Sequence, residues 1–193
     1  TSFIRMVIVF SMLRSAMGTQ QSPPNMVIIS LALFLTGYVM TPTLTEVWNQ
    51  GIEPLMNEQI DGVEAFKRGS VPLRNFMLSQ VREKDLALFV DLSGEDIATT
   101  TPQTVPITTL IPAFMISEIR RAFEIGFLLY IPFIVIDMVV ASILMSMGMM
   151  MLPPPMIAMP FKLIFFVMVD GWNLVAGSLV QSFGTTPPPG VGG

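Results

Sequence analysis

The sequence predicts an all-α integral membrane protein, in which apolar helical hairpins flank a charged helical insertion. Of its 193 residues, 52% are hydrophobic and only 12% are charged, whereas soluble domains carry about 25% charged residues. Apolar residues gather over 26–40 and 107–152, and a helix needs about 20 of them to span a bilayer. Residues 46–96 hold ten acidic and five basic side chains, which indicates a water-exposed region.

The net charge and the missing residue types exclude several functions. The formal net charge is −4, whereas nucleic-acid binding requires a basic face. The sequence has no cysteine and no histidine, which removes disulfides, thiolate nucleophiles, imidazole bases and ordinary zinc sites. We therefore expect a protein that is not an enzyme, that needs no cofactor or metal, and that contacts membrane lipid but no nucleic acid.

Residues 1–42 are expected to form an N-terminal apolar hairpin. Its first apolar run, over 3–13, is too short to span a bilayer, so we expect the start of this segment to be truncated. Gly18 and Pro23 predict a turn after this run. Pro42 is expected to end the second apolar segment, because proline cannot continue a helix.

Residues 43–108 are expected to form an extracytoplasmic helical domain. Apolar residues recur at about 3.6-residue spacing over 72–92, which predicts one amphipathic helix with Pro72 in its first turn. A shorter helix is expected to end at Gly69. The charged run over 82–85 is expected to be an ordinary solvated face, because surface ion pairs contribute little.

Residues 109–183 are expected to form a C-terminal apolar hairpin, which a linker over 93–106 precedes. The stretch over 107–152 exceeds the length of one straight span. We expect it to bend or fold back, with Pro112, Gly126 and Pro132 as the places where it does so. A last apolar segment covers 156–183, and the tail over 184–193 has no core-forming residue and is expected to be disordered.

Four charged residues lie inside the apolar segments and are candidate assembly residues: Glu118, Asp137, Lys162 and Asp170. A charge at the centre of a bilayer costs about 2.5–3.5 kcal/mol on insertion scales, so we expect these side chains to face a protein interior or a partner chain. Helical spacing places Glu118 next to Arg121, while Asp137 has no such neighbour. A pairing of Glu118 with Lys162, within or between chains, is a further hypothesis.

The same charges permit other interpretations. Asp137, Lys162 and Asp170 could form the relay of a small-solute or ion transporter, although the sequence shows no inverted repeat of broken segments. Asp137 and Asp170 could be the paired carboxylates of an intramembrane protease, although the flanking sequences IDMV and VDGW carry no supporting signature. Lys162 could also lie near a membrane interface and extend its ammonium group to water.

A stretch rich in methionine and proline separates the last two apolar segments, with the sequence MSMGMMMLPPPMIAMP at 145–160. Because a proline run cannot continue a helix, this stretch predicts an uncharged, irregular loop. Irregular backbone at membrane depth is tolerated only where it is buried in protein or lines a cavity. The loop is therefore a candidate pore or plug element. The alternative is a packing role, since methionine adapts to irregular gaps.

Five blocks of the sequence match one known family in the same order. They are GTQQSPPN at 18–25, SLALFLT at 30–36, PLRNFMLSQVREKDLALF at 72–89, LIPAFMISEIRRAFEIGFLLYIPFIVIDMVVASILMSMGMMMLPP at 110–154 and PFKLIFFVMVDGW at 160–172. The chain resembles the FliP family of flagellar export-gate proteins, whose injectisome relatives are called SctR. The resemblance extends from residue 1 to about residue 183 and leaves out the tail.

The resemblance implies a non-enzymatic pore subunit of the bacterial inner membrane, located in the flagellar basal body. Family members form a homopentamer that joins FliR and several copies of FliQ in a helical pore complex, with FlhB and FlhA nearby. Unfolded flagellar export substrates pass through this gate. The methionine-rich loop of the family is a constriction inside the gate, and the matching positions here are Met147, Met149, Met150 and Met151.

Overall fold

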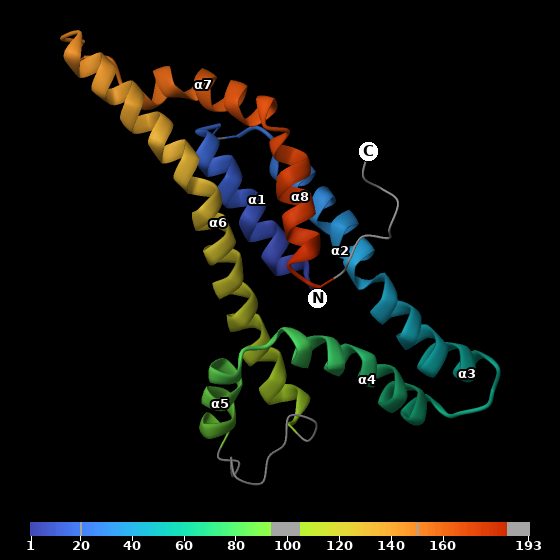
Figure 1. Ribbon diagram of the computed structural model, residues 1–193. Helices are drawn as coiled ribbons and strands as arrows, with labels where there is room; N and C mark the ends of the chain where they lie inside the picture. The colour runs from blue at the N-terminus through green and yellow to red at the C-terminus, as the bar shows by residue number, and fades with distance from the viewer. Residues whose placement is uncertain (20, 94–104, 150, 185–193) are drawn as a thin grey trace. The chain divides into compact units, whose positions relative to one another are not determined.

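The computed structural model describes residues 1–19, 21–93, 105–149 and 151–184. The secondary structure of these residues consists of helices, as the sequence predicts (Figure 1). In chain order the helices are α1 (Phe3–Met17), α2 (Asn25–Val47), the π-helical turn η1 (Trp48–Ile52), α3 (Glu53–Met56), α4 (Gly62–Gln80), α5 (Glu83–Leu92), α6 (Ile107–Ser146), α7 (Pro154–Met168) and α8 (Gly171–Gln181). Most of the predicted linker and of the predicted tail lies outside the described residues.

Among the described residues, two helical stretches are long and apolar enough to cross a membrane. They are Asn25–Met56, with 32 residues, and α6, with 40 residues. A third span is present if α7 and α8, which meet at a bend of 64°, are counted as one broken span. These lengths and compositions confirm the predicted all-α membrane protein.

The described residues form two compact units. The first consists of Thr1–Ile4 and Thr36–Arg120, and the second consists of residues 5–35 and 121–184. Each unit therefore combines two segments that are separated in the sequence. The helices α1, α2 and α6 contribute residues to both units.

In the first unit, the single helix α4 spans the predicted boundary between a helix that ends at Gly69 and a helix over 72–92. The Asp61 carboxylate accepts a hydrogen bond from the backbone N–H of Glu64 at 2.8 Å, which caps the helix N-terminus. The helix then continues through Gly69 and Pro72 to Gln80. The predicted end at Gly69 and the predicted single helix over 72–92 are therefore wrong.

The break between α4 and α5 follows from a contact with α6. Val81 and Arg82 are extended, with ψ angles of 143° and 139°, and the backbone N–H of Arg82 donates to the Ser117 hydroxyl at 3.1 Å. This hydroxyl in turn lies 2.6 Å from Asp85 Oδ2. The charged run over 82–85 is thus partly docked on α6 instead of being an entirely solvated face.

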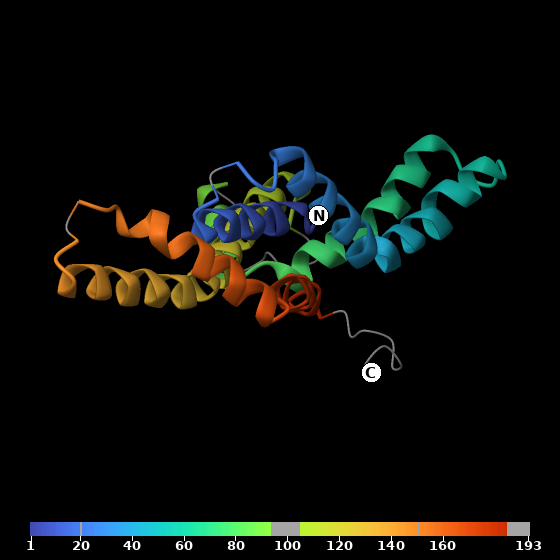
Figure 2. The ribbon, with the colours of Figure 1, turned by 90° about the horizontal axis from the view of Figure 1, so that it is seen from above.

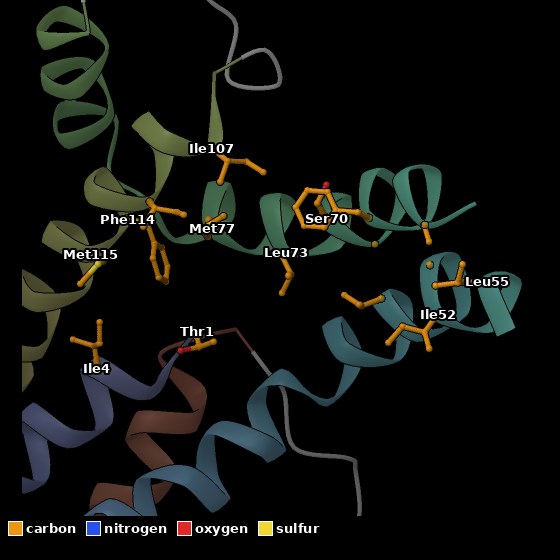
Figure 3. Close-up of a pocket in the computed structure, with 17 residues that line it drawn as sticks. Thr1, Ile4, Ile52, Leu55, Ser70, Leu73, Met77, Ile107, Phe114 and Met115 are labelled. Atoms are coloured by element: carbon orange, nitrogen blue, oxygen red, sulfur yellow. The ribbon is translucent and has the colours of Figure 1, made fainter. Parts of the chain in front are cut away.

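An apolar cavity of about 740 Å³ lies within the first unit. Figure 3 shows Leu73 and Met77 of α4 on one side of this space and Phe114 of α6 near them, with Ile52 and Leu55 at the opposite end. Next to it, η1 approaches α4 closely, because a Cβ atom on Gly51 would lie 2.8 Å from the carbonyl oxygen of Ala65. A glycine is therefore needed at this approach.

Proline residues interrupt fewer helices than predicted. Pro42 lies inside α2, so the predicted helix end at this residue is wrong. The helix α6 runs without a break through Pro112 and Pro132. Of the two expected outcomes for 107–152, a bend or a fold-back, the fold-back is therefore wrong. In apolar segments, neighbouring helices and small local adjustments satisfy the backbone groups that proline frees.

In the second unit, two glycines that the sequence marks as helix breakers have different roles. Gly18 has a φ of +79° and follows the last residue of α1, as predicted. Gly126 instead lies inside α6, where an added Cβ atom would meet Met12 Sδ at 2.4 Å. Gly126 therefore permits the close approach of α1 to α6.

The last apolar segment is two helices, not one. After α7, Asp170 adopts a left-handed conformation with φ 50° and ψ 49°, and α8 begins at the next residue. The edge of the Phe166 ring occupies the position that a Cβ atom on Gly171 would take, so only glycine fits at the start of α8. Phe166 also contacts Trp172 edge to face at a centroid distance of 5.2 Å.

Candidate pore loop and buried charges

The methionine-rich loop begins where α6 is closed by a glycine cap. Gly148 has a φ of +72°, and its backbone N–H donates to the carbonyl of Met145 at 3.1 Å. The N–H of Met149 donates to the carbonyl of Leu144 at 3.0 Å. These two bonds form a Schellman motif, which satisfies carbonyls that the helix end leaves free. Gly148 therefore ends α6 and turns the chain into the loop.

The loop ends where three prolines start α7. Pro153 is the N-cap, with φ −68° and ψ 114°, and Pro154 begins the helix. Proline suits this position because its missing N–H would have no helical partner there. Because α6 ends at Ser146 and α7 begins at Pro154, the predicted loop over 145–160 is too long at both ends.

The described methionines of this loop are exposed at the end of a helical hairpin. Figure 2 shows α6 and α7 meeting at the loop that joins them. The exposed fractions are 61% for Met147, 43% for Met149 and 98% for Met151, while Met150 lies outside the described residues. Within this one chain, these three side chains do not fill an internal gap.

Lys162 is the best-defined buried charge of the second unit. Its side chain is 6% exposed, and its Nζ atom donates to Asp137 Oδ2 at 2.6 Å and to the carbonyl oxygen of Ala16 at 3.0 Å. The ammonium group thus joins α7 to α6 and to the C-terminal end of α1. Inside the chain its acidic partner is Asp137, not Glu118 as hypothesised from the sequence.

Asp137 is only half satisfied by this contact. Its Oδ1 atom is buried and accepts no hydrogen bond from the residues that the structure describes, while the side chain as a whole is 34% exposed. The sequence predicts no charged partner for Asp137 three or four residues away on its own helix. The structure agrees with this, because Lys162 contacts Asp137 from α7. Because Lys162 bonds Asp137, it does not depend on a membrane interface to solvate its charge.

Glu118 and Asp170 occupy different environments. Glu118 is fully buried in α6 of the first unit, next to the equally buried Ser117. Asp170 is exposed in this chain, and its Oδ2 atom accepts a hydrogen bond from Asn173 Nδ2 at 3.1 Å. The carboxylates of Asp137 and Asp170 therefore have separate partners, and the structure gives no support to an aspartyl pair.

A second buried cation, Arg5, was not predicted from the sequence. Arg5 of α1 is fully buried, and its Nη1 atom donates to the Ser182 carbonyl at 3.1 Å and to the Ser182 hydroxyl at 2.8 Å. Its guanidinium carbon lies 3.6 Å from the centre of the Phe183 ring. The signal was present in the sequence, because Arg5 interrupts the apolar run FIRMVIVF.

The sequence matches known proteins along almost its whole length. The model of the FliP family matches residues 1–179. The flagellar biosynthetic protein FliP of Caulobacter vibrioides is 63% identical over 183 residues, covering 95% of this chain and 68% of that protein. The proteins of the same name from Rhizobium meliloti and Bacillus subtilis are 54% and 51% identical, and 75% and 82% of their lengths are covered. The chain therefore belongs to the FliP family of flagellar biosynthetic proteins.

Proposed function

We propose that the chain is a pore-forming subunit of the flagellar protein-export gate and that its methionine-rich loop seals the pore. Family membership makes it a membrane component of the flagellar export apparatus. The observation that supports the finer role is the exposure of Met147, Met149 and Met151 at the end of the α6–α7 hairpin. Large apolar side chains exposed in this way mark a surface that contacts another chain or lipid.

Methionine suits a seal that must open for a polypeptide and then close again. Its side chain is unbranched and polarizable, and it changes rotamer readily. An apolar ring of such side chains blocks ions by dewetting. The cap at Gly148 and the prolines that start α7 fix the two ends of the loop, so the methionines between them can move while the helices stay in place.

The proposed assembly is a homopentamer that joins FliR and FliQ, with FlhB and FlhA nearby. We place it in the bacterial inner membrane at the flagellar basal body, where unfolded flagellar export substrates pass through it. The exposed apolar faces of α6 and α7 support such an assembly, since Phe127, Leu128 and Phe161 are each more than half exposed in this chain. In an assembled gate these faces would contact other subunits or lipid.

Site-specific crosslinking tests the proposed contact of the loop with substrate. A photo-reactive amino acid at Met151, which is 98% exposed, should crosslink to an export substrate that is arrested in the gate by a folded domain fused to its end. The same amino acid at Phe66, which is 76% exposed on α4, is the matched control and should give no such product. Equal crosslinking from both positions, or none from Met151, would contradict the pore role of the loop.

The predicted side of the charged domain can be tested with a thiol reagent. We expect a cysteine at Asp61, in the capping position of α4, to react from outside the inner membrane with a membrane-impermeant maleimide. The given sequence has no cysteine of its own, so within it the reagent labels only the introduced cysteine. Ser15 is exposed just before the turn that joins the two segments of the N-terminal hairpin. A cysteine at this position should react only after the inner membrane is opened. The reverse pattern would invert the topology.

A further inference from the structure

The helix α1 is joined to the bent pair α7–α8 by one buried cation near each of its ends. Near its C-terminal end, Lys162 of α7 donates to the carbonyl oxygen of Ala16. Near its N-terminal end, Arg5 donates to the carbonyl oxygen of Ser182, the residue that follows α8. Figure 1 shows α8 running beside α1 in the opposite direction. All four residues belong to the second unit.

The two contacts are reciprocal helix caps. The last carbonyls of a helix have no intrahelical partner, and they carry the negative end of the helix dipole. Lys162 places a positive charge from α7 at this end of α1, and Arg5 places a positive charge from α1 at the corresponding end of α8. Each element therefore supplies the cation that caps the other.

The Arg5 contact is a buried site with several partners. Arg5 is fully buried and Phe183 is 7% exposed, and the guanidinium lies against the Phe183 ring while it donates to both oxygens of Ser182. A planar guanidinium can stack and donate along two directions at once, whereas a lysine ammonium acts as a point charge. The site therefore favours arginine over lysine.

Between the two caps lies the elbow at Asp170. Left-handed backbone is unfavourable for a residue other than glycine, and it persists only where the surrounding structure holds it. Here the φ of Asp170 is 50° and the two helices meet at 64°. We propose that the two reciprocal caps hold α7–α8 in its bent form and that Arg5 is the positioning residue at the far end. This proposal does not depend on the sealing role of the loop.

Distance measurements between spin labels test the proposal in the assembled particle. We place labels on cysteines at Met156 of α7 and Gln181 of α8, which are both exposed, and dilute labelled with unlabelled subunits. With Arg5 present we expect one narrow distance distribution. Arg5→Gln should broaden it at least twofold or add a second distance, because the end of α8 is released. Arg5→Lys should give an intermediate width.

The matched control is Arg14→Gln, which removes an arginine from the same helix. Arg14 donates to Asn25 and to the carbonyl of Pro23, so its loss should leave the distance between α7 and α8 unchanged. If Arg5→Gln does not assemble, the variant with Ser182→Ala and Phe183→Leu keeps the cation, removes its hydroxyl and ring partners, and should broaden the distribution less. An unchanged distribution in an assembled Arg5→Gln particle, or in that second variant, would overturn the proposal.

Discussion

Replacing Met149, Met150 and Met151 together by alanine should leave the export gate assembled and make cells that express it leak small ions and solutes. In the proposed pore, alanine side chains would be shorter than the methionines they replace, so the apolar constriction should widen and fill with water. The helices on both sides should be unaffected, because the glycine cap and the prolines that bound the loop stay in place. We expect a leak several times that of the parent gate.

The leak is measured as uptake of a small ion or dye by cells, after the assembled particle has been quantified. The control is a triple alanine variant at exposed methionines outside the loop, namely Met26, Met56 and Met168. It should not raise permeability. An unchanged permeability in an assembled loop variant would falsify the seal and leave the loop with a packing role.

Replacing Lys162 by alanine is expected to be the most damaging single change for assembly. It leaves Asp137 Oδ2 without its cation and the end of α1 without its cap. Breaking a fully buried ion pair costs about 3–5 kcal/mol, and the cost here should be smaller because Asp137 is 34% exposed. Recovery of the complex after detergent extraction should fall strongly. The control Lys84→Ala removes a lysine that is exposed on α5, and recovery should stay close to that of the parent.

Two double variants distinguish the partners of Lys162. Lys162→Met combined with Asp137→Leu removes both charges and should recover more complex than Lys162→Ala, because no unpaired charge stays buried. An exchange of charges between Lys162 and Glu118 tests the hypothesis that these two residues pair between chains. If the first double variant recovers nothing and the second recovers assembly, Glu118 and not Asp137 is the partner that matters in the complex.

The apolar composition and local turn chemistry were enough to predict much of the fold. The absence of charge over 26–40 predicts a membrane helix, and α2 begins at Asn25 as the prolines before it require. Gly18 ends α1 for a local reason, because left-handed backbone is open to glycine without a steric penalty. The four charged candidates were visible because charge is rare in apolar segments.

Only the tertiary structure decided where several helices break and which charges meet. The period over 72–92 continues through Val81, but the Ser117 hydroxyl accepts the N–H of Arg82 and divides the helix there. Gly126, which reads as a helix breaker, makes room for Met12.

Ser182 lies 177 positions from Arg5, and Asp137 and Ala16 lie 25 and 146 positions from Lys162. Helical spacing identifies partners only three or four positions apart. Local sequence therefore determined the helices and the loop ends of this protein. Contacts between distant segments determined its breaks and its buried caps, because a free backbone group or a buried charge is satisfied by whichever group the fold brings to it.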